Sequence, residues 1–280
     1  MSELIKYPRT HHLVGSRLQK GDEDLSQIPQ SMVLNKYIVI EEKVDGANTA
    51  ISFDEEGNLL LQNRGHYLIG GYRERHYNLF KNWATIHKDK LYSILGSRYI
   101  MYGEWLYAKH TVYYDALPHY FLEFDIFDRK RNVFLDTKTR HEMLKGSPII
   151  SVPVLAQGVY KNLNDIIKYL GRSNYITDDH ITNLTNEAIK CGYDPERAKA
   201  ETDSTTTMEG LYIKVEENGI VVDRMKYVRY SFLQTVTESN THWIDRTIIP
   251  NKLAVNIEEI FKWQLMIYIN ICQMLLLTGT

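Results

Sequence analysis

The feature that most constrains the fold is a series of short apolar or β-branched runs separated by turn sequences in the first half of the chain. Three such runs cover residues 37–43, 47–53 and 59–63. Asp45-Gly46 lies in the first gap and Glu56-Gly57-Asn58 in the second, and both sequences are typical of tight turns between strands. The spacing predicts an antiparallel meander that begins near residue 37.

Helices are expected to follow and flank these strands. Residues 75–90 have a helix-compatible composition and precede a second strand pair at 99–107 and 119–128. Asp136 is predicted to cap a helix that runs toward residue 145. The polar stretch 163–200 predicts further helices that flank the sheet.

A hairpin is predicted near the end of this pattern. Residues 209–215 and 220–226 alternate in polarity and are joined by Glu217-Asn218-Gly219, a strong hairpin turn. Beyond about residue 230 the chain becomes helix-prone and ends in a hydrophobic segment, 257–277.

Size and composition are those of a globular protein. The chain has 280 residues, of which 44% are apolar and 24% charged, enough for one sizeable core and too apolar for a disordered chain. We expect an α+β fold of antiparallel sheets flanked by helices, with a main domain at residues 1–235 and a short helical C-terminal extension at 236–280. The net charge of −2 gives no overall attraction to a polyanion, so any nucleic-acid surface must come from local clusters of Lys and Arg.

Cysteine usage and the termini indicate a cytoplasmic protein. Cys191 and Cys272 are far apart and in no metal-ligand spacing, which argues against a zinc site or a disulfide scaffold. The first ten residues are polar, so we expect no secretory signal. Residues 265–277 are apolar but short for a membrane span and contain Asn270 and Gln273. A packed helix, rather than a membrane anchor, is expected there.

Lys43 is the candidate nucleophile. It ends an apolar strand and precedes the Asp45-Gly46 turn, which places its amine at the edge of a cleft. To react, the amine must lose its proton near neutral pH, which burial, neighbouring cations or a bound metal favour by destabilising the ammonium form. Taken alone, the segment Lys43-Val44-Asp45-Gly46 is more typical of a solvated lysine before a hairpin turn.

Acids and bases on later strands favour the reactive lysine. Glu104 lies on one predicted strand, and Glu209 and Lys214 lie on another. Arg224 and Lys226 have the i, i+2 spacing that places two side chains on one face of a strand. Strands arranged so would direct acids and bases into one groove, as a triphosphate with magnesium requires.

In order and spacing these residues resemble the nucleotidyltransferase motifs of the covalent ligase and capping-enzyme superfamily, especially those of nick-sealing phage RNA ligases and RNA-editing ligases. The resemblance spans roughly residues 40–226. The segments that carry it, from motif I to motif V, are Lys43-Val44-Asp45-Gly46 with Asn48, Arg64 in Asn63-Arg64-Gly65, Glu104, Phe121-Leu122-Glu123-Phe124-Asp125-Ile126, Glu209 to Lys214, and Arg224 with Lys226. Motif V usually carries two lysines, and an arginine at position 224 keeps the charge but changes the geometry.

The resemblance implies an ATP-dependent RNA ligase of nucleotidyltransferase fold that uses Mg²⁺ or Mn²⁺. Lys43 would form lysyl-AMP, the AMP would pass to an RNA 5′-phosphate, and a 3′-hydroxyl would then seal the two ends during RNA repair. Glu42 would border the adenine and Phe124 would stack on it. The implied ATP or AMP ligands are Glu42, Asn48, Arg64, Glu104, Phe124, Lys214, Arg224 and Lys226. The implied acids on the metal side, acting through water, are Asp45, Glu104 and Glu209.

Several of these residues also have plain structural interpretations. Arg64 and Arg224 could be surface arginines, and Phe124 could pack in the core. The segment 9–17 could contact RNA or be a solvated entry strand. Tyr72 and other tyrosines that are interleaved with Arg73 and Arg75 could stack on bases or be ordinary half-buried residues.

The sequence leaves rival functions open. An ATP-dependent DNA ligase is disfavoured by the Asn48 match and by the roughly fifty residues that follow motif V, fewer than an OB-fold needs. A GTP-dependent capping enzyme and an inactive RNA-binding relative are two further rivals. The expected partners are RNA ends or a nicked duplex. Because no Gly-x-x-x-x-Gly-Lys-Ser/Thr loop is present, we also expect a separate end-healing kinase or phosphatase.

Overall fold

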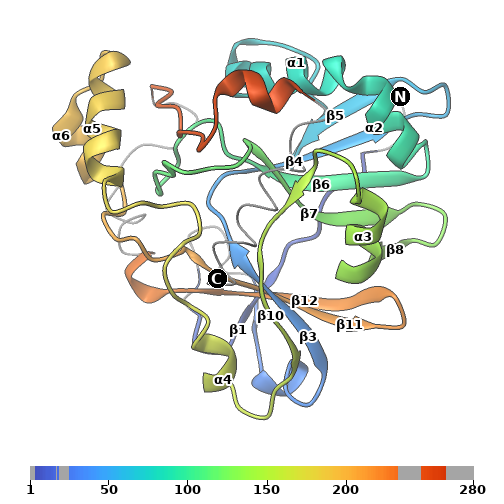
Figure 1. The fold of residues 1–280 in the computed structure, drawn as a ribbon. Coiled ribbons are helices and arrows are strands. Elements are labelled where there is room, and N and C mark those ends of the chain that lie inside the picture. Colours follow the sequence, from blue (N-terminus) through green and yellow to red (C-terminus); the bar gives the residue numbers. More distant parts are fainter. Residues whose placement is uncertain (1–3, 17, 19–24, 233–246, 263–280) are drawn as a thin grey trace, which may run out of the picture.

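All strands in the described part of the chain belong to one sheet. The computed structural model describes residues 4–16, 18, 25–232 and 247–262 (Figure 1). The main path of the sheet runs β10-β3-β11-β12-β8-β7-β6-β4-β5, with β1, β2 and β9 paired at its sides. The strands are β1 (His11–Leu13), β2 (Gln27–Ile28), β3 (Tyr37–Lys43), β4 (Ala47–Phe53), β5 (Leu59–Asn63), β6 (Tyr99–Trp105), β7 (Phe121–Asp128), β8 (Val133–Leu135), β9 (Ile150–Ser151), β10 (Val154–Val159), β11 (Gly210–Glu217) and β12 (Ile220–Val228).

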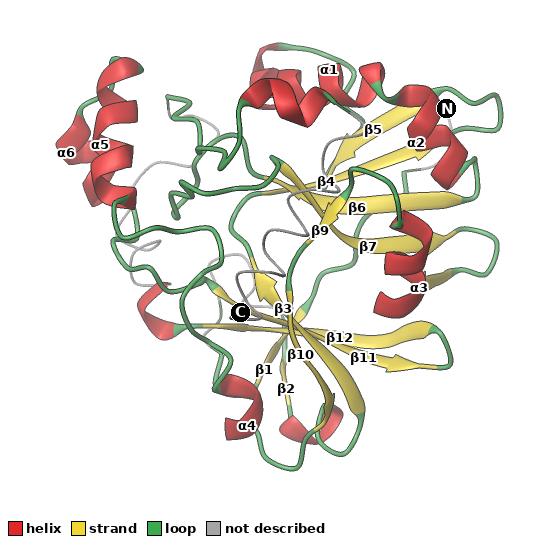
Figure 2. Cartoon of the chain, in the orientation of Figure 1, coloured by secondary structure: helices red, strands yellow, loops and turns green. Residues whose placement is uncertain are grey.

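The helices lie around this sheet (Figure 2). Along the main path, neighbouring strands pair antiparallel, so the predicted α+β fold of antiparallel strands with flanking helices is confirmed. The helices are η1 (Gln30–Met32), η2 (Tyr72–Tyr77), α1 (Asn78–Ile86), α2 (Lys88–Leu95), α3 (Thr137–Leu144), α4 (Asn164–Ile167), α5 (His180–Lys190), α6 (Pro195–Ala200) and η4 (Ile257–Phe261).

The sheet folds into two halves that meet at the short strand β8. One half holds β3, β10, β11 and β12, and the other holds β4 to β7 (Figure 2). β8 pairs with β12 through Leu135 and Phe134, and with β7 through Phe134 and Val133. Each half has its own apolar cluster, one around Trp83, Trp105 and Phe121 and one around Ile40 and Ile213. Backbone pairing between the halves is therefore sparse, and side chains must hold them together.

The predicted bounds of β3, β4 and β5 are confirmed. The predicted meander is wrong at its first step, because β3 pairs with β10 and β11 while β4 pairs with β5 and β6 in the other half of the sheet. Asp136 caps α3 as predicted, with its carboxylate accepting a hydrogen bond from Thr139 N at 2.9 Å. The helix-compatible composition of residues 75–90 is confirmed, because this stretch lies within η2, α1 and α2, with a break at His87.

Two further expectations need correction. α5 and α6 pack on each other and on Tyr113 and Ile249, away from the strands, rather than flanking the sheet (Figure 1). Within the predicted helical extension, residues 247–256 are extended, bridge the loop after β6 through Pro250 and Leu253, and are followed by η4. The apolar segment from residue 263 onward lies outside the described residues. Across the described ranges, no helix is both long and apolar enough to cross a membrane.

A network of buried charges joins the two halves. Lys214 Nζ of β11 lies 2.8 Å from Glu41 Oε2 of β3 and 3.1 Å from Asp125 Oδ1 of β7. Arg140 of α3 donates to Glu41 and to Glu123 of β7, each at 2.7 Å. Burial alone would raise the pKa of Asp125, but Lys214, Arg224 and Arg140 lower it below its usual value. Asp125 is therefore held ionised inside the protein.

Replacing Lys214 with Met should destabilise the fold strongly. The substitution leaves Glu41 and Asp125 buried without their shared cation, and breaking a buried pair in this way costs roughly 3–5 kcal/mol. The free energy of unfolding in urea would measure the loss. Lys190→Met is the matched control, because Lys190 is 71% exposed and its pair with Glu187 should contribute at most about 1 kcal/mol. Equal effects of the two variants would contradict the role of the network.

Candidate active site

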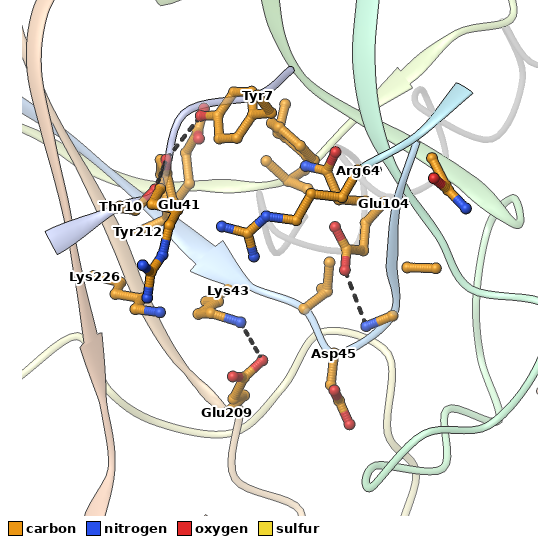
Figure 3. A pocket seen from close by; sticks show the side chains of 18 of the residues that line it. Tyr7, Thr10, Glu41, Lys43, Asp45, Arg64, Glu104, Glu209, Tyr212 and Lys226 are labelled. Carbon is orange, nitrogen blue, oxygen red and sulfur yellow. Dashed lines mark hydrogen bonds and ion pairs between the residues drawn. The ribbon is translucent and has the colours of Figure 1, made fainter. Parts of the chain in front are cut away.

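A cavity of about 700 Å³ opens between the two halves, a size typical of small-molecule sites. Residues from β3, β4, β6, β7 and β12 and the N-terminal segment line it. Figure 3 shows charged side chains from both halves pointing into it. Of the residues predicted for the site, the cavity brings together Glu42, Lys43, Asp45, Asn48, Arg64, Glu104, Phe124, Glu209 and Lys226.

Strand register places Lys43 beside Glu209. Lys43 ends β3 and pairs with Gly210, the first residue of β11. Glu209 directly precedes that strand, and its Oε2 lies 2.6 Å from Lys43 Nζ (Figure 3). Gly210 is required here, because a Cβ at this position would lie 2.2 Å from the carbonyl oxygen of Tyr227. The close approach of β11 to β12 thus depends on the glycine that follows Glu209.

The Asp45-Gly46 turn directs Glu104 toward the lysine. Gly46 N donates to Glu104 Oε1 at 3.1 Å, and Glu104 pairs with Asn48 in the β4–β6 register. A Cβ at Gly46 would lie 2.7 Å from the carbonyl oxygen of Trp105, so only glycine allows this turn to pack against β6. The turn therefore links the end of β3 to Glu104, which lies on β6 in the other half of the sheet.

The acids, rather than burial, decide the charge of Lys43. Burial alone would lower the pKa of Lys43, but Glu209, Glu104 and Asp45 raise it above its usual value. Burial raises the pKa of Glu209 to about 7 and that of Glu104 to about 8. The expectation that burial makes this amine neutral is therefore wrong for the cavity by itself. A cation bound beside these acids would offset their negative charge and lower the pKa of Lys43.

Asp45 lines the cavity but its carboxylate points away from Lys43 (Figure 3). Oδ2 accepts from the backbone N–H groups of Thr111 and Val112 at 2.7 and 2.9 Å. Its own N–H donates to the hydroxyl of Tyr114 at 2.7 Å. The structure thus gives Asp45 an anchoring role that the sequence did not indicate. In the described parts of the chain, no three His, Cys, Asp or Glu residues are grouped to hold a metal ion.

Glu42 is anchored in the same way on the other side of Lys43. Its carboxylate accepts hydrogen bonds from Ser173 Oγ and from both the backbone and side-chain nitrogens of Asn174, at 3.1 and 2.6 Å for the latter two. Burial raises its pKa in spite of these donors. Glu42 still lines the cavity, as expected for a residue that borders a bound base.

Lys214 and Arg224, predicted to bind the nucleotide, do not line the cavity. Lys214 is fully buried in the charge network, and the guanidinium carbon of Arg224 lies 3.8 Å from the centroid of the Phe134 ring. Their register explains both placements, because Tyr212 pairs with Lys226 at the cavity while Lys214 pairs with Arg224 one step deeper on the same face. The sequence indicated the correct face of the two strands, but not that Lys214 and Arg224 lie beyond the cavity.

Arg64 and Lys226 are the predicted cations that do line the cavity. Arg64 sits in a tight turn held by Asn63 Oδ1, which accepts from Gly65 N at 2.8 Å and His66 N at 2.9 Å. Its side chain extends toward Lys43 (Figure 3). Phe124 lines the same cavity, where its ring meets Tyr7 edge-on at a centroid distance of 5.1 Å. Positive charge and aromatic surface thus line the same cavity as Lys43.

Tyr7, Thr10 and Tyr212 also line the cavity, and the sequence analysis did not predict them as site residues. The hydroxyl of Tyr212 lies 2.7 Å from that of Tyr7 and 2.9 Å from Thr10 Oγ1, and Tyr7 also donates to Asp125. This chain of hydrogen bonds fastens the N-terminal segment to β11 and β7. The segment had been interpreted as an RNA contact or a solvated strand, and no local pattern could reveal partners more than a hundred residues away.

Comparison with known proteins agrees with this geometry. A sequence profile described as RNA ligase matches residues 36–228. No curated protein matches the chain. Two structures of a Naegleria gruberi RNA ligase, an apo variant and a variant with AMP and Mn, give a TM-score of 0.51 at 13% and 12% identity and cover 84% of this chain. The same ligase with pyrophosphate gives 0.50 at 13% identity. The chain spans 59% of the solved ligase, and the likeness confirms the predicted nucleotidyltransferase fold.

Replacing Glu209 with Gln should lower the pKa of Lys43. The substitution removes a negative charge 2.6 Å from the amine, and an adjacent opposite charge shifts a pKa by about 1–3 units. The measurement is the pH dependence of Lys43 modification by an amine-reactive reagent, followed by mass spectrometry. Glu217→Gln, at the exposed far end of β11, is the control and should keep the wild-type midpoint. An unchanged or higher midpoint in Glu209→Gln would show that the acids do not control this amine.

Proposed function

Because the chain belongs to the RNA ligase family, whose profile covers residues 36–228, we propose that it joins RNA ends with ATP through a lysyl-AMP intermediate at Lys43. The observation that carries the proposal is the convergence of one amine, two acids and two cations on a single cavity. Lys43 and Glu209 are in contact there, and Glu104, Arg64 and Lys226 line the same space. Amine, phosphate-binding cations and metal-binding acids are the groups that adenylyl transfer requires.

In the first step, the neutral amine of Lys43 attacks the α-phosphorus of ATP. A P–N bond forms, the bond from the α-phosphorus to the bridging oxygen breaks, and pyrophosphate leaves. Glu209 Oε2, 2.6 Å from Nζ, is placed to accept the proton that the amine must lose.

In the next steps the AMP is passed on and released. An oxygen of an RNA 5′-phosphate attacks the AMP phosphorus, which breaks the P–N bond and restores Lys43. The 3′-hydroxyl of the other end then attacks the activated phosphate, and AMP leaves as the phosphodiester forms. Negative charge develops on a phosphoryl oxygen in each displacement. Arg64 and Lys226 would stabilise it electrostatically.

The residues present fit a nucleotide and a divalent cation. Phe124 offers an aromatic face beside the cavity, Glu42 borders it, and Asn48 stands opposite Glu104. Glu104 and Glu209 are the acids that would hold Mg²⁺ or Mn²⁺, with water and phosphate oxygens completing the shell. When bound, such an ion would supply positive charge to the phosphates and counteract the acids that hold the proton on Lys43. The Naegleria ligase, solved with AMP and Mn, supports extending both ligands to this chain.

We propose RNA repair as the setting, with RNA ends or a nicked duplex as the substrate. Ligation of this kind needs a 5′-phosphate and a 3′-hydroxyl. The chain carries no phosphate-loop kinase motif in its 280 residues. A separate kinase or phosphatase would then prepare the ends before this protein acts.

The lysyl-AMP intermediate can be tested by incubation with α-labelled ATP and Mg²⁺ or Mn²⁺. We expect label to stay on the denatured wild-type chain and to be lost in Lys43→Ala, because that substitution removes the attacking nitrogen. Lys190→Ala, on the exposed end of α5, should label like wild type. Equal labelling of Lys43→Ala would refute the mechanism, and stronger labelling from GTP would indicate a capping enzyme.

The substrate can be tested with nicked duplexes that differ only in sugar chemistry, together with hairpin and single-stranded RNA. We expect sealing when the reacting ends are RNA and a loss of about tenfold or more when both are DNA, since a contact to one 2′-hydroxyl is worth about 1.4 kcal/mol or more. Preferential sealing of the all-DNA nick would instead identify a DNA ligase. Tight RNA binding without adenylylation would identify an inactive RNA-binding relative.

A further inference from the structure

An exposed segment of the chain lies next to the cavity and has no part in the chemistry described so far. The chain leaves the cavity after Arg64 and His66, and returns to it at Tyr77. Between these points, Ile69 is 84% exposed and Tyr72 is 79% exposed. The guanidinium carbon of Arg75 lies 4.5 Å from the centre of the Tyr72 ring. An aromatic face paired with a cation is thus presented to solvent beside the proposed reaction site.

The charge that this region presents to solvent is positive. Residues 63–77 are all described and contain Arg64, Arg73 and Arg75 but a single acid, Glu74. Glu74 is buried, pairs with Lys81, and accepts a hydrogen bond from Gly70 N at 2.8 Å. The acid is therefore neutralised inside while the arginines remain near the surface. The local charge is opposite to the net charge of −2 for the whole chain.

Hydrogen bonds fix the base of the segment, and two glycines form its tip. Leu68 N donates to Leu61 O at 2.8 Å, and Trp105 Nε1 donates to His76 O at 2.8 Å. At the tip, Gly70 and Gly71 have φ angles of 121° and 117°, which favour glycine. A Cβ at either glycine would meet no atom within 4 Å. The tip therefore has open space around it for a ligand.

The distance between Tyr72 and the cavity corresponds to a few nucleotides of RNA. Tyr72 and Tyr77 are the two ends of η2, which precedes α1 (Figure 1). At a rise of about 2 Å per residue, their backbones lie roughly 10 Å apart. A nucleic-acid strand advances about 3.4 Å per nucleotide, so Tyr72 is about three nucleotides from the cavity.

We propose that the Ile69–Arg75 segment is an RNA-contact surface for the nucleotides that adjoin the ends being joined. Tyr72 stacks on a base, and Arg73 contacts a backbone phosphate. Exposed aromatic rings with neighbouring arginines are the usual means by which proteins bind bases and phosphates without reading sequence. The inference rests on the proposed function for the identity of the substrate, and its tests below are separate from those of the chemistry.

The main test measures binding of a single-stranded RNA by fluorescence anisotropy in the absence of ATP, because stacking on Tyr72 needs an unpaired base. Base stacking on an aromatic side chain contributes about 1–3 kcal/mol, so Tyr72→Ala should weaken binding by roughly 5- to 150-fold. Tyr72→Phe keeps the ring and should stay within about twofold of wild type. Tyr37→Ala is the matched control, because Tyr37 is 43% exposed but lies at the opposite end of β3 from Lys43. It should bind like wild type.

Salt dependence tests the arginine. Removal of one phosphate contact should reduce the slope of log K against log salt by about one unit in Arg73→Ala. A slope equal to that of wild type would overturn the assignment of Arg73.

Two outcomes overturn the proposal and one separates it from the chemistry. If Tyr72→Ala binds RNA as tightly as Tyr37→Ala, or if Tyr72→Phe loses as much affinity as Tyr72→Ala, no stacking occurs at this ring. If wild type forms no lysyl-AMP while Tyr72→Ala selectively loses RNA binding, the RNA surface stands and the ligase mechanism fails. Label uptake from α-labelled ATP by Tyr72→Ala is the parallel readout, and we expect it to match wild type because Tyr72 does not line the cavity.

Discussion

The structure depends on a set of buried charges that no backbone pairing could replace. The two halves of the sheet share only the short strand β8, so Lys214 and Arg140 hold β3 and β11 against β7 through Glu41, Glu123 and Asp125. Buried ions are costly unless every one is paired, and few arrangements satisfy all five at once. Because Glu41 lies two residues before Lys43, the same contacts that align the halves also fix the position of the reactive amine.

Much of the fold and of the site could be predicted, because both depend on local patterns. Alternating runs and Asp-Gly or Asn-Gly turns defined β3, β4, β5 and the β11–β12 hairpin within a residue or two. What could not be predicted was how deeply each side chain is buried between the two halves of the sheet. Lys214 and Lys226 share the polarity, spacing and strand character of cavity residues, yet one step of register separates the protein interior from the cavity. Partners of Tyr7, more than a hundred residues away, were likewise invisible in the sequence.

The electrostatics of the cavity suit a nucleophile that is inactive until its substrate arrives. Glu209 and Glu104 have pKa values raised by burial to about 7 and 8, and together with Asp45 they hold the proton on Lys43. Arg64 and Lys226 line the same cavity, and in the proposed reaction they would bind phosphates. A lysine that is an ammonium ion by default is protected from unwanted acylation, and its reactivity then depends on cations that neutralise the neighbouring acids.

The residues on either side of Lys43 determine which partner must travel during the reaction. Glu42 is bonded to Ser173 and Asn174, and Asp45 is bonded to the amides of Thr111 and Val112. The end of β3 is therefore held from both directions by loops that are distant in the sequence. Any forward movement of the backbone would break these bonds at once. In the proposed reaction, the approach of the phosphorus to the amine would therefore fall to the nucleotide, and how far the nucleotide reaches into the cavity would set the separation of the reacting atoms.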